Sequence, residues 1–317
     1  MIPVYSIVIP VYNAQEYLDA CVQSVLNQKS DAPVEIILVN DGSRDGSAAI
    51  CDRYAAQDPR VQVIHQENQG VSVARNAGIR AAQGEYLLFL DSDDLWDENL
   101  LVSIDQLVSR QPDMIDFGCC YFTDSGAGTV NCPTCIADGE DGDTYFFRHE
   151  QQGVVPLVSA CMAAFRRQFL LDNGLAFPVG VAYGEDFTLC MHCLKYAKSI
   201  YTVSQPLYRV RVNENSVTHT PNLKKIRDIL SVCAGMYRLH PGSLLADYYA
   251  MSVWTIEGLT RKDAQQVYDL LEQNRDILKQ VRGTRAKLAC GLYSAFGWYG
   301  GAKALRFLAN ARKSIKG

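Results

Sequence analysis

Runs of apolar residues that suit buried strands alternate with helical patterns over the first 110 residues of this 317-residue chain. The strand-like runs are 5–9, 34–39, 61–64 and 85–90. Residues with helical spacing are 12–27, 46–57, 73–82 and 97–109, the third with Ser72 placed as its N-cap. This alternation predicts a parallel, doubly wound α/β sheet flanked by helices. Because right-handed crossovers bring the strand carboxyl ends to one edge, we expect the ligand site there.

The pattern becomes less regular beyond residue 111. Strands are expected at 114–122 and 158–165, with one or two more over 201–212, and helices at 166–173 and 185–197. Residues 123–143 are rich in Gly, Asp and Thr and are expected to form an irregular excursion. Only helical patterns follow residue 222. We therefore expect one α/β domain over residues 1–218, with halves of about 1–110 and 111–218, and a helical C-terminal extension over 219–317.

The composition is that of an ordinary globular protein, with 48% hydrophobic and 21% charged residues. A net charge of −5 gives no reason to expect a nucleic-acid partner. The chain has no apolar run of 18 residues and no basic start, so we expect neither a membrane span nor a secretory signal. Eleven cysteines in such a chain indicate reduced thiols in the cytoplasm. The Cys132 and Cys135 pair lacks the second half of a zinc site, so free thiols and a redox or metal pair both stay open.

The last 36 residues contain eight basic side chains and no acidic one, whereas the rest of the chain has 22 basic and 35 acidic residues. Apolar residues at helical spacing among these cations predict one or two basic amphipathic helices over Arg285–Lys313, broken at Gly300-Gly301. Such helices can lie on an anionic membrane surface. Packing on the rest of the protein, or on a second copy in a homodimer, would explain the pattern equally well.

Three carboxylates follow the fourth predicted strand directly, in the segment Asp91-Ser92-Asp93-Asp94. Carboxylates this close repel one another unless solvent or a cation screens them. Mg2+ and Mn2+ prefer such oxygen ligands and need only one or two of them when phosphate oxygens and water complete the shell. An acidic turn that caps the next helix, through Asp94 or Asp97, is the other interpretation.

Further polar residues are predicted at the same sheet edge. Asp41 ends the second strand, and Pro10-Val11-Tyr12-Asn13 ends the first. Arg75 lies in the first turn of the helix after Asn68-Gln69-Gly70, where a guanidinium can bind a diphosphate. Each residue alone fits a simple turn or a surface cation, but their convergence on one edge favours a diphosphate and metal site.

Four segments resemble family 2 glycosyltransferases of the GT-A fold. They are SIVIPVYNAQEYLDACVQSVLNQ, VEIILVNDGSRDGS, NQGVSVARNAG and GEYLLFLDSDD, in the order and approximate spacing typical of that family. The resemblance is dense over residues 4 to 110 and thinner through GEDFTLC and QPLYRVRVNENSVT. It implies an inverting transferase that uses a nucleotide sugar, most often UDP-linked, and Mn2+ or Mg2+.

The resemblance also implies roles for individual residues. Pro10, Val11 and Tyr12 would line the nucleobase pocket with Glu16 nearby, and Asp41 would accept a hydrogen bond from uracil or ribose. Asn68, Gly70 and Arg75 would surround the nucleoside and phosphates. Asp91, next to Ser92, would contact ribose or the metal's hydration shell, and Asp93 would bind the metal directly.

Glycosyl transfer also needs a base that takes the proton of the acceptor hydroxyl. Glu185 and Asp186 precede the helix at 185–197, and acidic residues there are also favoured by the helix dipole alone. With the resemblance, Asp186 becomes the expected base and Glu185 a hydrogen-bonding partner of the acceptor or sugar. His219 could reach the metal or diphosphate, or could be an ordinary exposed histidine. Tyr208, Arg209 and Arg211 could approach the phosphates, or could be the outward-facing residues of a strand.

These observations together predict a glycosyltransferase that acts on a polysaccharide, glycolipid or glycoprotein precursor. A nucleotidyltransferase also uses strand-end carboxylates with a metal, although it usually has a Gly-rich basic loop after its first strand, which Pro10-Val11-Tyr12-Asn13 does not provide. A sugar-nucleotide-binding module without catalysis is the alternative outside enzymes.

Overall fold

The computed structural model describes residues 2–123, 126–133, 135–156, 159–212 and 222–316. The chain divides into two compact units. The N-terminal unit comprises residues 1–148, 157–180 and 185–214, and the C-terminal unit comprises 149–156, 181–184 and 215–317. The long helical region thus takes two short segments of the preceding sequence into its own unit.

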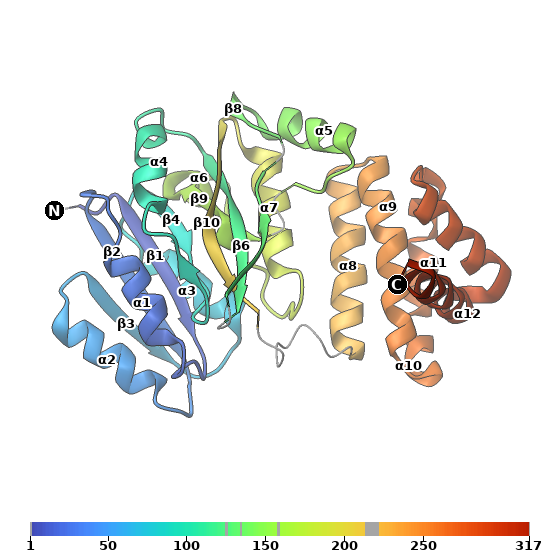
Figure 1. The fold of residues 1–317 in the computed structure, drawn as a ribbon, viewed down its shortest axis with the longest axis horizontal. Helices are drawn as coiled ribbons and strands as arrows, with labels where there is room; N and C mark the ends of the chain where they lie inside the picture. Colours follow the sequence, from blue (N-terminus) through green and yellow to red (C-terminus); the bar gives the residue numbers. More distant parts are fainter. Residues whose placement is uncertain (1, 124–125, 134, 157–158, 213–221, 317) are drawn as a thin grey trace. The chain divides into compact units, whose positions relative to one another are not determined.

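One sheet forms the centre of the N-terminal unit (Figure 1). Its main strand order is β3-β2-β1-β4-β9-β6-β10-β5, with β7 paired to β6 and β8 to β10. The strands are β1 Tyr5–Val11, β2 Val34–Asp41, β3 Val61–Gln66, β4 Tyr86–Phe89, β5 Leu95–Trp96, β6 Met114–Thr123, β7 Gly126–Asn131, β8 Asp138–Glu140, β9 Ala163–Arg166 and β10 Ile200–Arg211. Strands β3, β2, β1 and β4 are parallel, β6 is parallel to β10, and β9 and β5 join antiparallel. The predicted α/β class with a doubly wound parallel region is confirmed.

Helices flank this sheet (Figure 1). They are α1 Leu18–Leu26, α2 Ser47–Gln57, α3 Val71–Ala81, α4 Leu100–Val108, α6 Arg167–Asp172 and α7 Glu185–Tyr196, while α5 Gly142–Gln152 passes from this unit into the next. Helix α3 packs so closely on β1 that a Cβ atom at Gly78 would lie 2.2 Å from Val8 Cγ1. Glycine at that position therefore lets α3 approach the sheet, and α3 carries Arg75.

The core around β1 and β4 is largely apolar, with Ser6 as a buried polar residue of β1, and this explains why these strands could be recognised. All seven residues of β1 and all four of β4 are buried. The Phe89 ring packs edge-on to Phe177 at 5.0 Å and tilted against Phe165 at 6.1 Å. Each buried aromatic side chain of this kind contributes about 2–3 kcal/mol through removal of apolar area from water. Strands buried on both faces read in sequence as continuous apolar runs.

Two helices begin at other residues than the sequence predicts. Helix α1 starts at Leu18 instead of Tyr12, because Asn13 Oδ1 and Gln15 Oε1 accept hydrogen bonds from the backbone N–H groups of Arg44 and Gly46 in the turn after β2. Those contacts hold the preceding segment in an irregular conformation.

Helix α3 starts at Val71, and its N-cap is Gly70, whose φ of 92° suits glycine. The predicted N-cap Ser72 is wrong, since it lies inside the helix with its buried hydroxyl unpartnered.

Other boundaries shift because strands pair with distant segments. The helix predicted at 97–109 is confined to α4, because Leu95 and Trp96 form β5 against Arg209 and Tyr208 and the backbone N–H of Asp97 still donates to the Leu207 carbonyl at 2.9 Å. The excursion predicted at 123–143 contains the strands β7 and β8. The strand predicted at 158–165 is the shorter β9, which follows a 3-10 turn over Ala160–Met162.

The C-terminal unit is helical, as the sequence predicts. It contains α8 Leu223–Leu239, α9 Ser243–Ser252, α10 Arg261–Gln265, α11 Tyr268–Gln273, α12 Thr284–Lys316 and 3-10 segments over Val253–Gly258 and Arg275–Gln280. Asn222 caps α8 by accepting a hydrogen bond from Lys225 N at 2.9 Å. Its core includes Leu230, Tyr249, Ile256 and Leu271. No described helix has both the length and the apolar character that crossing a bilayer requires.

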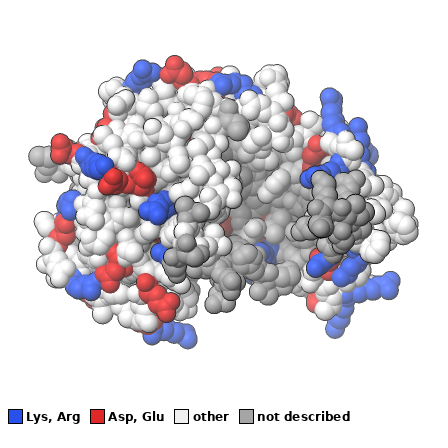
Figure 2. Space-filling view, viewed as in Figure 1, with Lys and Arg blue, Asp and Glu red and all other residues white. Residues whose placement is uncertain are grey.

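Helix α12 is interrupted, but not where the sequence suggests. The break lies at Gly297, whose φ of 69° is left-handed, and not at Gly300-Gly301. Gly301 has a different role, since a Cβ atom there would lie 2.7 Å from the Leu292 backbone. It allows the two halves of α12 to approach each other. Lys and Arg side chains stand out from the surface of this unit (Figure 2).

Candidate functional site

The ends of three parallel strands bring most of the predicted site residues to one edge of the sheet. Val11 at the end of β1 pairs with Asn40, next to Asp41 at the end of β2. Asp91 follows β4 by two residues. The sequence argument from strand order therefore places these groups on the same edge, as found.

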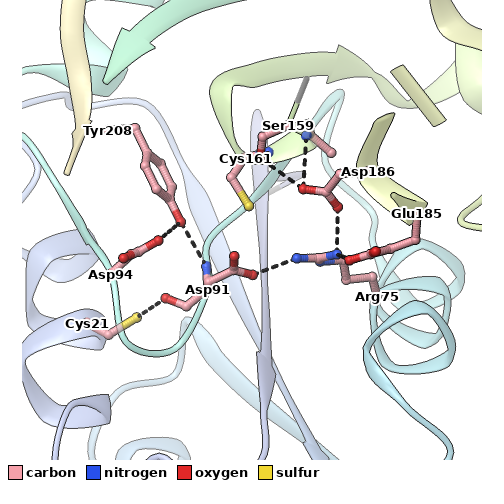
Figure 3. Close-up of polar contacts among 10 residues, drawn as sticks. Cys21, Arg75, Asp91, Asp94, Ser159, Cys161, Glu185, Asp186 and Tyr208 are labelled. Atoms are coloured by element: carbon pink, nitrogen blue, oxygen red, sulfur yellow. Dashed lines mark hydrogen bonds and ion pairs between the residues drawn. The ribbon is translucent and has the colours of Figure 1, made fainter. Parts of the chain in front are cut away.

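Arg75 is the centre of this edge (Figure 3). Its side chain is 3% exposed, and its Nη2 donates to Asp91 Oδ1 at 2.7 Å. Its Nη1 donates to Asp186 Oδ1 at 2.7 Å and to Glu185 Oε1 at 3.2 Å. The guanidinium carbon lies 5.0 Å from the centre of the Phe177 ring. One side chain thus joins the strand-end carboxylate to the acidic pair at the start of α7.

The electrostatics of this group are dominated by burial and by the shared cation. Burial alone would lower the pKa of Arg75, but the carboxylates of Asp186 and Asp91 hold that pKa well above its usual value. Burial raises the pKa of Asp186 to about 6, although Arg75 opposes the rise. Three carboxylates share one guanidinium, which leaves a formal charge of −2 for the four groups when all are ionised. Such a site favours an additional cation.

The second oxygen of Asp186 is also bound. Asp186 Oδ2 accepts hydrogen bonds from Ser159 Oγ at 2.9 Å and from Ala160 N at 3.3 Å. These donors fix the carboxylate from the side opposite Arg75. Ser159 could not be recognised from the sequence, because its residue type and position were consistent with an ordinary strand. Cys161, on the same turn, is a buried thiol whose pKa is raised well above normal by burial and by Asp91.

Asp94 is part of the sheet edge and does not cap a helix. The N-cap of α4 is Asn99, and Asp94 is buried, accepting hydrogen bonds from Tyr208 Oη at 2.8 Å and Arg211 N at 2.7 Å. Burial, followed by the charge of Asp91, raises the pKa of Asp94 to about 8. The predicted cap at Asp94 is therefore wrong, because both carboxylate oxygens of Asp94 accept hydrogen bonds from residues of β10.

The residues predicted around the nucleoside fall into two sets. Asp41 is buried and accepts hydrogen bonds from Gln66 Nε2 at 2.7 Å, Gln69 N at 2.9 Å and Gly70 N at 2.8 Å, so it holds the turn before α3. Pro10 and Val11 are buried within β1. The exposed residues near these strand ends are Tyr12, Glu16, Asn68 and Gly70, and Ser92 and Asp93 are half-buried.

The donor set fits a divalent cation only if the substrate supplies further ligands. Among the described residues, no three His, Cys, Asp or Glu side chains converge as a ready-made metal site. Asp91 and Asp93 offer hard oxygen ligands beside a group that carries excess negative charge. Mg2+ and Mn2+ at phosphate sites usually take one or two protein carboxylates, which these residues can provide.

Two other predictions concern residues away from this edge. His219 lies outside the described residues. Cys132 is half-buried and Cys135 is buried, and both are free thiols, as are the other nine cysteines.

Comparisons with known proteins agree with this architecture. The model of "Glycosyl transferase family 2" matches residues 6–173. The uncharacterized glycosyltransferase YibD of Escherichia coli K12 is 47% identical over 223 residues, which are 67% of this chain and 62% of YibD. The chain spans less than two thirds of the first curated relatives that it matches, 62% and 64% of their lengths.

Solved structures share the fold at low identity. S. aureus TarS 1–349 in complex with UDP has a TM-score of 0.70 at 17% identity, covering 97% of this chain and 91% of that one. The mannosyltransferase PcManGT from Pyrobaculum calidifontis, in complex with GDP-Man and Mn2+, has a TM-score of 0.57 at 17% identity and covers 99% and 87%. The predicted GT-A type architecture is thereby confirmed, and the chain belongs to glycosyl transferase family 2.

Proposed function

We propose that this chain transfers a sugar from a nucleotide donor to an acceptor hydroxyl, with inversion and with a divalent metal. The arrangement around Arg75 carries the proposal, because it joins Asp91 and Asp186, which lie 95 positions apart, through 2.7 Å contacts at one buried side chain. Carboxylates at the donor end and a carboxylate at the acceptor end are what the two halves of a glycosyl transfer need. Family membership supports the same reaction class.

Asp186 is the proposed base, with Glu185 hydrogen-bonding the acceptor or sugar. A pKa of about 6 leaves Asp186 mostly ionised at neutral pH and more basic than an exposed aspartate. Ser159 and Ala160 keep one of its oxygens in place, so the oxygen that contacts Arg75 is the one that would face the acceptor. Arg75 would then move its Nη1 hydrogen bond toward the donor phosphates.

Asp93 is the proposed metal ligand, with Asp91 beside it. When bound, a divalent cation would act as a Lewis acid on the leaving diphosphate. The negative charge around Arg75 gives an electrostatic reason for the cation to bind. The Mn2+ present in the complex of the mannosyltransferase neighbour supports the use of a divalent metal.

UDP is the proposed carrier, supported by the UDP complex of TarS. Tyr12 and Glu16, exposed in the segment after β1, would contact the nucleobase, with Pro10 and Val11 behind them. Asn68 and Gly70 would contact the nucleoside. Asp41 would act on nucleoside binding chiefly by holding the turn at Gln69 and Gly70. Both of its carboxylate oxygens already accept hydrogen bonds there, which leaves little capacity to bind the nucleobase.

The acceptor is proposed to be a hydroxyl of a polysaccharide, glycolipid or glycoprotein precursor. Exposed Leu288, Phe296 and Phe307 on α12, among the basic residues of that helix, favour a contact of Arg285–Lys313 with an anionic membrane surface. Flotation with phosphatidylglycerol vesicles tests this, with Phe296→Ser and Phe307→Ser expected to reduce binding. A shift to dimers without flotation would show a homodimer contact instead.

Binding and turnover together test the proposed function. UDP is expected to raise the melting temperature more with MnCl2 than without it, because ligands that bind the folded state stabilise it. UDP-sugar should also be hydrolysed slowly in the presence of Mn2+. Binding without any hydrolysis or transfer would identify a sugar-nucleotide-binding module, and pyrophosphate release from a nucleoside triphosphate would identify a nucleotidyltransferase.

A further inference from the structure

Tyr208 is a buried tyrosine whose hydroxyl reaches the loop that follows β4 (Figure 3). The residue is 1% exposed and lies on β10 between Trp96 of β5 and Cys119 of β6. Its hydroxyl accepts a hydrogen bond from Asp91 N at 3.2 Å and donates one to Asp94 Oδ2 at 2.8 Å. Both contacts are made to the segment that contains the proposed metal ligands.

Arg211, also on β10, holds two more points of the same segment. Its backbone N–H donates to Asp94 Oδ1 at 2.7 Å, and its Nε donates to the carbonyl oxygen of Asp93 at 3.0 Å. The guanidinium is itself stacked on Phe122 and Tyr17, at 4.6 and 5.0 Å from their ring centres. Strand β10 therefore binds the loop at three residues, which are Asp91 at its start, Asp93 and Asp94.

These contacts hold the backbone at the start of the loop, at Asp91, and the peptide group directly after the proposed ligand, at the Asp93 carbonyl. With the backbone of Asp91 and Asp93 and the side chain of Asp94 all held from β10, the direction of the Asp93 side chain is largely set before a metal arrives. A site that is preorganised in this way binds more tightly than one that must order on binding.

We propose that Tyr208 and Asp94 are positioning residues that set the loop Asp91–Asp94 for divalent cation binding. This inference rests on the proposed function, because it assigns the loop to a metal. Asp94 would then contribute to cation affinity without being a ligand, since both of its oxygens are bound to β10.

The chain offers a matched control for Tyr208. Tyr145 is also 1% exposed, and its hydroxyl donates to the buried carboxylate of Asp116 on β6 at 2.9 Å. Tyr208→Phe and Tyr145→Phe each remove one buried hydroxyl from a carboxylate. Any difference between them in metal binding therefore reports the position of the hydroxyl and not a general loss of stability.

The experiment measures Mn2+ binding to the full chain by electron paramagnetic resonance in the presence of UDP. Y208F should weaken Mn2+ binding about tenfold or more, because the two hydrogen bonds that hold the loop at Asp91 and Asp94 are lost. Its affinity for UDP without metal should stay within about twofold of the unaltered protein, because Arg75 still holds the Asp91 side chain and the proposed nucleoside contacts of Asn68 and Gly70 are unchanged. Y145F should bind Mn2+ normally. If Y208F fails to fold, Asp94→Asn should weaken Mn2+ binding in the same direction.

Normal Mn2+ binding by Y208F, or an equal loss in Y145F, would overturn the inference while leaving the proposed function intact. If the unaltered protein with UDP bound no Mn2+, the metal part of the proposed function would fail, and this inference with it.

Discussion

Arg75 forms ion pairs with three carboxylates at once, so its single positive charge is shared among them. Its Nε is buried without a hydrogen-bond partner, so its two Nη atoms make the contacts with Asp91, Glu185 and Asp186. Breaking one partner of a buried ion pair usually destabilises a protein strongly, because a charge is left behind. Substitutions that keep the shape of the side chain are therefore the informative ones here.

Asp186→Asn tests the proposed base. We expect transfer to fall about 10²- to 10⁴-fold, the usual effect of removing a general base, while UDP binding stays near normal. Asp116→Asn is the matched control, because Asp116 is a buried, hydrogen-bonded carboxylate away from this site. Steady-state kinetics and UDP titration measure both variants. Transfer by D186N within a few-fold of the unaltered rate would remove Asp186 as the base.

The pH dependence of transfer follows from the same residue. Because burial raises the pKa of Asp186 to about 6 and the base must be ionised, the rate should fall as the pH drops below about 6. Arg75 lowers this pKa, so the remaining activity of Arg75→Gln should begin to fall at a higher pH. A pH–rate profile of both proteins measures the shift. Identical acid limbs would show that Arg75 does not act on the base.

At the scale of elements, the first half of the sheet was predictable and the irregular segments were not. Strands β1, β2 and β4 are buried apolar runs, so their pattern alone identifies them. The segment before α1 was misassigned because Asn13 and Gln15 bind the distant turn at Arg44 and Gly46. Local periodicity carries no information about such long-range contacts.

The site was likewise predictable only in part. Strand order alone brings Asp41 and Asp91 to one edge, whereas the link to Glu185 and Asp186 came only from the family resemblance. Ser159 was not predicted as a site residue, since a serine in a turn is ordinary until its partner is known. Tyr208 was considered only as a possible phosphate contact, and its hydrogen bond to Asp94 was not foreseen.

The break in α12 gives a prediction about backbone conformation. Gly297→Ala should lower the free energy of unfolding by about 1–2 kcal/mol, because alanine is strained in the left-handed region. Gly291→Ala should instead raise it by about 0.5–1 kcal/mol, since Gly291 is helical and exposed. A Cβ atom has free space at both positions, so sterics do not separate the two variants. Urea denaturation measures them, and equal stability would show that the break is not required.

At the scale of the whole molecule, the N-terminal unit contains several aspartates whose pKa values lie above that of an exposed aspartate. Burial is the first cause that raises the pKa values of Asp94, Asp116 and Asp186, to about 8, 7 and 6. Between about pH 4 and these values the folded protein binds more protons than the unfolded chain. The stability that this supplies is present below pH about 4 and is lost as the pH rises through the folded pKa values.

The melting temperature should therefore decrease from pH 5 to pH 8, and Asp116→Asn should show a smaller decrease than the unaltered protein. In the unaltered protein, MnCl2 with UDP should also reduce the decrease in melting temperature, because a bound cation stabilises the ionised carboxylates. Thermal denaturation across this pH range, with and without the ligands, measures both effects. An equal slope in D116N would contradict the role given to Asp116.

The shared guanidinium also means that energies at this site cannot be assigned to one residue at a time. Asp91 and Asp186 each contact Arg75 at 2.7 Å from different segments of the chain. Losing one of them changes the charge balance that the other experiences, so a double-mutant cycle between these two aspartates should show non-additive effects. Substitutions tolerated singly on the donor side and on the acceptor side would then fail in combination, or rescue each other.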